Sequence, residues 1–445
     1  MRIGVWSGTL ICGAGLALAC SDDERAPRLG SPRPIPGCAS YSAAPCDIRT
    51  SDCQNELFSL MACLRGEPVA GEQPPSITLL DRAAAVAQIT SQAGGSPDVM
   101  MGTDGVAAMA GMPGDELAFR AQVRGLELLG LIAEGEVQDT ADVVEVTLSS
   151  LLAYYFVPTQ EIVIIDDGEP VTDLNANSVL AHELVHALQD RRHGLASLGG
   201  GAPLDSDSSL AIDSLVEGEA SMYQYLYSFA AQGAAVELIN FDAFFANLEG
   251  AGDGVTLDSS SPILTAPTIF PYTYGTAYAG GRWVNGGPAA IDALYANLPR
   301  TTLEVLGGGG GAITAWAQGP TPLDGYTLAG EDTAGAWVTA SMLAGLPRVG
   351  APPALATLSR RWRGDRLWIF ATADDPPAVA AAWAIDWQDA SAAAEFAERA
   401  AAFAPAGATL ALDTSGRSTR LCVAERAEEL EVWRARLAEV APLPP

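Results

Sequence analysis

The sequence predicts an α+β protein, with a mainly helical domain that carries a small sheet and a smaller α+β subdomain at the C-terminal end. Three observations support this prediction. Of the 445 residues, 49% are apolar, which is enough for a large core. Before residue 330, long stretches place apolar residues at helical spacing, and one pair of β-rich runs interrupts them. Past residue 330, short β-rich runs alternate with helical segments.

The first residues have the pattern of an export signal. Arg2 precedes a short uncharged apolar stretch, which is shorter than the roughly 20 residues of a membrane span. The stretch ends in Leu-Ala-Leu-Ala directly before Cys20, which resembles the lipobox of bacterial lipoproteins. We expect residues 1–19 to be a lipoprotein signal peptide and Cys20 to carry the lipid that anchors the chain at the cell envelope, at the outer membrane or cell surface. An ordinary secretory signal is the alternative.

Residues 20–45 are predicted to be a flexible tether, because this segment begins polar and rich in Pro and Arg. Four cysteines lie close together, at Cys38, Cys46, Cys53 and Cys63. Their spacing lacks the CxxC pairs that are typical of structural zinc sites, so we expect two disulfides in an oxidising compartment. Three pairings remain open, and Cys422 is left over.

The first domain is expected over 46–330. Helices are predicted over 46–64, 116–132, 140–152, from residue 172 or 173 to about 193, and over 210–229 with further helix to 248. Two β-rich runs joined by Pro-Thr-Gln predict a hairpin over 154–157 and 161–165. Less regular segments are predicted over 92–114 and 199–209, up to 265, and at the five glycines over 307–311.

The second domain is expected over 331–445. Four strands are predicted, over 367–370, 379–385, 409–412 and 421–424. Two helices are predicted, over 390–403 and 425–440.

The charge balance excludes one class of partner. The chain has 54 acidic and 24 basic residues, and its net charge is −30. Such a chain repels phosphates of nucleic acid and anionic lipid headgroups. We therefore expect no nucleic-acid partner, and contact with a membrane only through Cys20.

The clearest chemical signal is the sequence His182-Glu183-Leu184-Val185-His186, in a chain with only three histidines. Residues four apart lie on one face of a helix, so both imidazoles can reach one metal ion. Glu183 stands beside that face, where a carboxylate can take a proton from a water that zinc has made acidic. Two structural histidines on a half-buried helix are the alternative.

A zinc site needs a third protein ligand, and Glu217 on the next predicted helix is the better candidate. It would complete a His₂Glu set and leave the fourth position open. Glu219 is the competitor, but it lies about 200° away around the helix. His193 lies about 10 Å further along its own helix, which is too far for a ligand. The pattern HExxHxxGxxH is excluded, because the chain has Gln189 and Arg192 at the two later positions.

The motif and the later helical glutamate resemble the gluzincin branch of zinc metallopeptidases. More narrowly, AHELVHALQD over 181–190 and VEGEA over 216–220 resemble a group of bacterial envelope proteins with a zincin-like domain. Other pieces fit that group: Phe270-Pro271-Tyr272 with Gly275, LPRTTLE over 298–304 and WRGDR over 362–366. The resemblance covers residues 151–404. It implies a zincin-like fold, Zn²⁺ on His182, His186 and Glu217, and Glu183 as the catalytic base.

Further candidates follow from the expected chemistry. Tyr272 and Tyr274 could stabilise negative charge on a substrate oxygen, although tyrosines on a loop more often serve packing. Asp213, one turn before Glu217, could orient a ligand histidine, with a solvated or capping carboxylate as the alternative. By analogy with zincin-like folds, residues 163–165 would form an edge strand that binds substrate backbone, and a purely structural strand is the alternative.

Three functions remain open at this point. The leading hypothesis is a zinc-dependent peptidase that acts on peptides or proteins at the cell surface. The first alternative is a zinc hydrolase of another amide or ester, because the motif determines the activated water and not the substrate. The second is a catalytically silent envelope lipoprotein that uses the domain as a binding or structural module.

Overall fold

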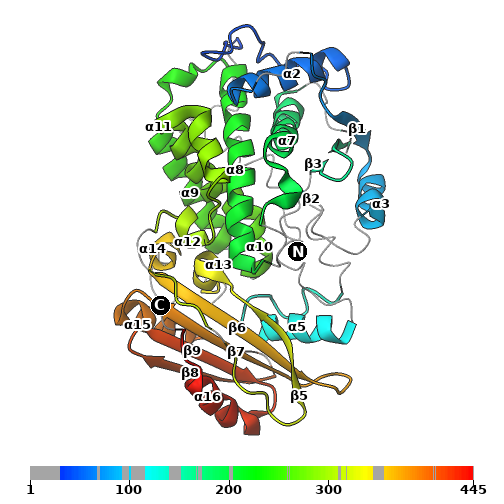
Figure 1. The fold of residues 1–445 in the computed structure, drawn as a ribbon. Helices are drawn as coiled ribbons and strands as arrows, with labels where there is room; N and C mark the ends of the chain where they lie inside the picture. The colour runs from blue at the N-terminus through cyan, green and yellow to red at the C-terminus, as the bar shows by residue number, and fades with distance from the viewer. Residues whose placement is uncertain are drawn as a thin grey trace, which may run out of the picture.

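The computed structural model describes residues 31–67, 71–92, 100–101, 116–139, 152–166, 168, 173–199, 204–257, 259, 261–308, 312–316, 318–343, 355–403, 405 and 407–443. The architecture is α+β, as predicted, with a helical region that carries a four-stranded sheet and a second region built on a five-stranded sheet (Figure 1). Within the described residues, no helix combines the length and the apolar character needed to cross a membrane. The expected signal peptide and Cys20 lie outside the described residues.

The N-terminal segment is held by two disulfides, Cys38–Cys63 and Cys46–Cys53, which selects one of the three open pairings. Helix α2 (Ser51–Leu64) begins at Thr50, whose side chain accepts a hydrogen bond from the backbone N–H of Cys53. The flexible tether that was predicted over 20–45 cannot extend as far as residue 45. Ile35 is buried, because the chain is already part of the core from that residue onward.

The first sheet has the strand order β1-β4-β3-β2. Strands β3 (Ala153–Phe156) and β4 (Glu161–Ile165) form the predicted antiparallel hairpin. Strand β1 (Ser76–Leu80) was not predicted and pairs with β4 in parallel, and helix α3 (Arg82–Gln92) follows it. The expected edge strand at 163–165 is therefore an interior strand.

The predicted loop over 92–114 contains a short strand, β2 (Met100–Met101), which pairs with β3. The rest of that loop from residue 93 on, and nearly all of the helix predicted over 140–152, lie outside the described residues.

Two long helices form the centre of the first region. Helix α7 (Leu174–His193) begins at Asp173 and ends at Gly194, which has a left-handed φ of 66°, as predicted. Helix α8 (Ser206–Ala231) begins earlier than expected, within the predicted loop over 199–209. The reason is Asp205, whose carboxylate accepts a hydrogen bond from the N–H of Ser208 and caps the helix.

The helices after α8 are more continuous than predicted. Helix α9 (Phe241–Leu257) continues beyond residue 248, and α10 (Pro262–Phe270) replaces the end of the expected irregular stretch. A π-helical turn (Pro271–Gly275) joins α10 to α11 (Thr276–Tyr295). The short helices α12 (Thr302–Val305), α13 (Gly335–Ser341) and α14 (Leu355–Ser359) lead to the second sheet.

The second sheet is antiparallel in the order β5-β6-β7-β9-β8. The four predicted strands are present and longer than expected: β6 (Trp362–Thr372), β7 (Val379–Trp387), β8 (Thr409–Ser415) and β9 (Ser418–Ala424). Both predicted helices are present as α15 (Ala390–Ala400) and α16 (Leu430–Glu439), and the latter begins after a 3₁₀ turn. Strand β5 (Tyr326–Asp332) was not predicted, and it pairs with β6 across the expected boundary at 330/331.

Helix α5 (Glu116–Leu128) shows that the two regions are not consecutive stretches of chain. It was predicted as part of the first domain, but it packs against β6 and β7 of the second sheet (Figure 1). A Cβ on Gly125 would lie 2.5 Å from Cγ2 of Ile369, so the helix and the sheet are in close contact. The domain over 46–330 therefore contributes one helix to the core of the other region.

The disulfide Cys38–Cys63 leads to a prediction about stability. The bond closes a loop with a sequence separation of 25 residues. Replacing both cysteines by serine should lower the free energy of unfolding by about 3 kcal/mol, because the unfolded chain gains conformational entropy. Urea unfolding of the full chain would measure this loss. A loss below about 1 kcal/mol would show that packing alone holds the segment.

Candidate metal centre

His182, His186 and Glu217 lie together at the contact between α7 and α8, which pack side by side (Figure 1). The Nε2 atoms of the two imidazoles are 3.0 Å apart. Oε2 of Glu217 lies 3.0 Å from Nε2 of His182 and 3.4 Å from Nε2 of His186. The sequence reasoning therefore named three side chains that the fold brings to one point.

The donor set fits a metal ion. All three side chains are buried, with exposed fractions of 7% for His182, 0% for His186 and 1% for Glu217. Two imidazole nitrogens and one carboxylate oxygen converge, and these are the atoms that bind divalent transition metals. Oε1 of Glu217 is buried and has no hydrogen-bond partner within the described part of the chain. The three residues could therefore hold a metal ion.

Glu217 and His186 each stabilise the charged form of the other. Burial alone would raise the pKa of Glu217, but the imidazoles of His186 and His182 lower it well below its usual range. Burial alone would lower the pKa of His186, but the Glu217 carboxylate raises it to about 9. Glu217 is therefore an ionised carboxylate in a buried site, and such a charge needs a cationic partner close by.

Glu183 lies beside the cluster and is 4% exposed. A backbone hydrogen bond from Tyr155 in β3 reaches its carboxylate, which ties the start of the motif to the first sheet. Burial raises the pKa of Glu183, while the imidazoles of His186 and His182 lower it. Its Oε2 atom has no hydrogen-bond partner among the residues that the structure describes, so this oxygen is available to take a proton.

Tyr272 lies close to the cluster, although not on the loop that was expected. It belongs to the π-helical turn, and its ring centroid lies 6.0 Å from that of His182. Close backbone contact brings this turn to α8, since a Cβ on Gly218 would lie 2.2 Å from the carbonyl carbon of Gly275. The glycine of the VEGEA segment therefore allows the turn that carries Tyr272 to approach the helix that carries Glu217.

Three other candidates are not among the side chains that converge in the cluster. The Tyr274 hydroxyl donates a hydrogen bond to Asp253, at 2.7 Å. His193 stacks on Tyr295 with ring centroids 3.8 Å apart. Asp213 lines a small cavity between α8, α10 and α13 and makes no hydrogen bond to either ligand histidine within the described residues.

Sequence reasoning missed the residues that surround His186 on its other side. Nδ1 of His186 lies 2.8 Å from Oε1 of Gln189. The Gln189 amide donates to the carbonyl of Val216 at 2.8 Å and to Glu219 at 2.9 Å. Gln189 had been noted only because it breaks a longer histidine motif. Its position three residues after His186 is the one signal in the sequence that could have identified it.

Comparisons with known proteins inform only the second region. A family described as a domain of unknown function (DUF8575) matches residues 325–438. The match begins next to β5 and extends into α16, so it covers the second sheet and none of the three candidate metal ligands. No curated protein and no solved structure matches the chain.

The cluster leads to a prediction about metal binding. Zn²⁺ added to chelator-treated protein should raise the free energy of unfolding by about 4 kcal/mol when free zinc is 1,000 times its dissociation constant. Glu217→Gln should remove most of this gain, because it replaces an anionic ligand by a neutral one. Thermal unfolding with and without zinc would measure both.

Asp207→Asn is the matched control for this experiment. Asp207 is a buried carboxylate near the start of α8, and it accepts hydrogen bonds from Thr302. The zinc-dependent gain should be the same in this variant as in the unmodified chain. An equal gain in Glu217→Gln would contradict the assignment of Glu217 as a ligand.

Proposed function

We propose that this chain is a zinc-dependent metallohydrolase with a zincin-like fold, and in particular a peptidase that cleaves bonds in peptides or proteins. One observation carries the proposal. His182, His186 and Glu217 converge within 4.8 Å, and Glu183 follows His182 in the same helix. The Oε2 atom of Glu183 has no hydrogen-bond partner among the described residues. Two histidines and one glutamate are the ligand set of a catalytic zinc site.

The residues of this chain divide the chemistry between them. His182, His186 and Glu217 would hold the ion. A Zn²⁺ ion bound there supplies Lewis acidity, which makes water a competent nucleophile at neutral pH. Glu183 is the general base, because its Oε2 atom has no partner within the described part of the chain and because burial makes its carboxylate more basic. The same carboxyl group can return the proton to the leaving amine.

Tyr272 is the candidate for a further role. Hydrolysis places negative charge on the substrate oxygen, and a hydroxyl close to the metal would stabilise that charge. The ring of Tyr272 lies nearly parallel to that of His182, with an angle of 25° between the two planes. We propose that its hydroxyl donates a hydrogen bond to the substrate oxygen.

The two disulfides bear on where in the cell the chain is located. Two disulfides favour an oxidising environment. We propose that the chain is exported and lipid-anchored through Cys20 at the bacterial cell envelope, with peptides or proteins as substrates and no nucleic-acid partner.

Two alternatives use the same residues. The ligands and the base would equally serve hydrolysis of another amide or of an ester, because they determine the nucleophile and not the acyl group. A binding or structural module would retain the ligands without turnover. Measurements of metal content and of turnover together distinguish the peptidase, the other hydrolase and the binding module.

Glu183→Gln tests the proposed reaction. The substitution keeps the size of the side chain but removes the group that takes the proton. Hydrolysis of a mixed peptide library by the zinc-loaded chain should fall by roughly 10²- to 10⁴-fold. The zinc content of the variant should stay unchanged, because Glu183 is not among the three converging ligands.

Glu237→Gln, at an exposed site, is the control and should keep full activity. Equal turnover by Glu183→Gln and the unmodified chain would contradict the role of Glu183. A zinc-loaded chain that cleaves esters but no peptide would favour the first alternative. A zinc-loaded chain that cleaves neither would favour the binding module.

A further inference from the structure

The stapled segment, by which we mean residues 35–67 with their two disulfides, ends at a buried cation close to the metal centre. Arg65 follows α2 directly and is 3% exposed. Its Nη1 atom lies 2.5 Å from Oε1 of Glu219, and its Nε atom lies 2.8 Å from Glu67. Burial alone would lower the pKa of Arg65, but Glu219 and Glu67 raise it, so the guanidinium stays charged.

Glu219 connects Arg65 to α7, because it also contacts Gln189 of that helix. Its Oε2 atom accepts hydrogen bonds from the Gln189 amide at 2.9 Å and from the Tyr295 hydroxyl at 2.7 Å. Glu219 lies two residues after the ligand Glu217, but it points to another side of α8 and is not one of the converging ligands. A buried carboxylate with a guanidinium on one oxygen and two donors on the other has little freedom to move.

The direction of these hydrogen bonds determines the state of His186. The NH₂ group of Gln189 must face Val216 and Glu219, because both contacts are acceptors. Oε1 of Gln189 is then the atom that faces Nδ1 of His186, and an oxygen can only accept. His186 must therefore carry a proton on Nδ1, which leaves the lone pair of Nε2 free to bind a metal when the ring is neutral.

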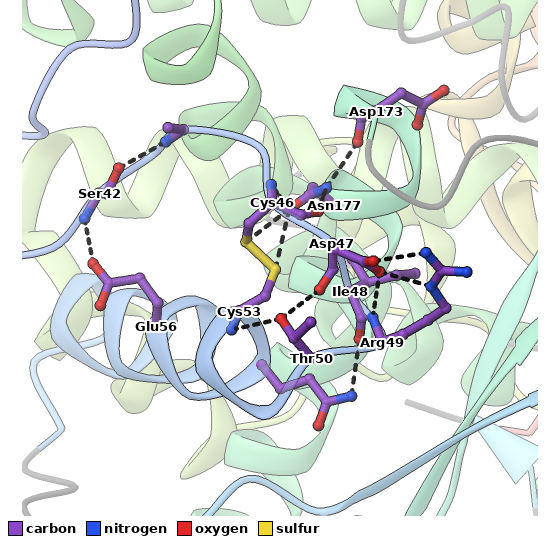
Figure 2. The surroundings of a disulfide bond; sticks show 12 residues. Ser42, Cys46, Asp47, Ile48, Arg49, Thr50, Cys53, Glu56, Asp173 and Asn177 are labelled. Carbon is purple, nitrogen blue, oxygen red and sulfur yellow. Dashed lines mark hydrogen bonds and ion pairs between the residues drawn. A yellow bond between two sulfur atoms is a disulfide. The ribbon is translucent and has the colours of Figure 1, made fainter.

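The stapled segment also contacts α7 before the first ligand histidine (Figure 2). Oδ1 of Asn177 accepts a hydrogen bond from the backbone N–H of Cys46 at 3.1 Å, and its Nδ2 donates to the carbonyl of Cys46 at 2.8 Å. Cys46 belongs to the disulfide with Cys53, so this short loop is covalently closed where it meets the helix. The segment therefore contacts α7 five residues before His182 and, through Glu219, three residues after His186.

We propose that Gln189 is a positioning residue that fixes the tautomer and orientation of the ligand His186. Arg65 of the stapled segment supports this role, because its charge holds Glu219 where Glu219 holds Gln189. The stapled segment is thus a component of the metal centre. This inference rests on the proposed metal-dependent function.

Gln189→Leu in the full chain tests the inference. The dissociation constant for Zn²⁺, measured by competition with a chelator, should rise by roughly 10- to 100-fold, because a ligand histidine loses its outer hydrogen bond. The absorption spectrum of the Co²⁺-loaded variant should also change, because the ring of His186 is no longer fixed. Gln224→Leu is the control, since Gln224 is an equally large buried amide on α8, and it should leave both readouts unchanged.

Glu219→Gln is the second variant and keeps the shape of the side chain if Gln189→Leu fails to fold. It should weaken zinc binding in the folded protein in the same direction. Urea unfolding of the metal-free variants separates a loss of stability from a loss of metal affinity. If Glu219 served only to pair with Arg65, the free energy of unfolding would fall while the dissociation constant for zinc stayed the same.

The outcomes distinguish this inference from the proposed function. If the unmodified chain binds zinc and both variants bind it equally tightly with an unchanged Co²⁺ spectrum, the positioning role is wrong and the metal centre stands. If the unmodified chain binds no zinc, both are wrong. Weaker binding and an altered spectrum in either folded variant, with an unchanged Gln224→Leu control, would support the positioning role.

Discussion

The structure of the first region depends on a buried carboxylate held between two imidazoles. Glu217 is 1% exposed and lies within 3.4 Å of Nε2 of both His182 and His186. An isolated charge at such a depth would be strongly destabilising, so it is tolerated only where opposite charge or a metal ion compensates it. The packing of α7 against α8 provides this compensation, because it brings the three side chains to a single point.

A second set of close contacts joins α8 to the π-helical turn. A Cβ on Gly275 would lie 2.3 Å from the carbonyl oxygen of Ser214, and a Cβ on Gly218 would touch Gly275 in turn. Only glycine at both positions allows the π-helical turn to lie this close to α8. The turn then brings Tyr272 beside His182, so a packing constraint places an aromatic ring near the candidate metal ligands.

Much of the candidate site was readable from the sequence because the information is local. The spacing of His182 and His186 predicts a shared helix face wherever the helix lies, and Asp173 and Gly194 mark its ends. The contact between Arg65 and Glu219 could not be predicted from the sequence, because the two residues are 154 positions apart in the chain. Strand β1 was missed for a similar reason, since its parallel pairing with β4 is a long-range contact. The same holds for α5, whose apolar face predicts burial but not against which sheet.

The second region also contacts the start of α8, the helix that carries Glu217. The backbone N–H and the hydroxyl of Ser206, the first residue of the helix, both donate to Asp332 at the end of β5. The backbone N–H of Asp207 donates to the carbonyl of Thr333. The helix that carries Glu217 is therefore anchored at its first turn by the region that matches the family of unknown function, and at its middle by the stapled segment. Both anchors therefore lie on the helix that carries Glu217, although neither contains one of the three candidate metal ligands.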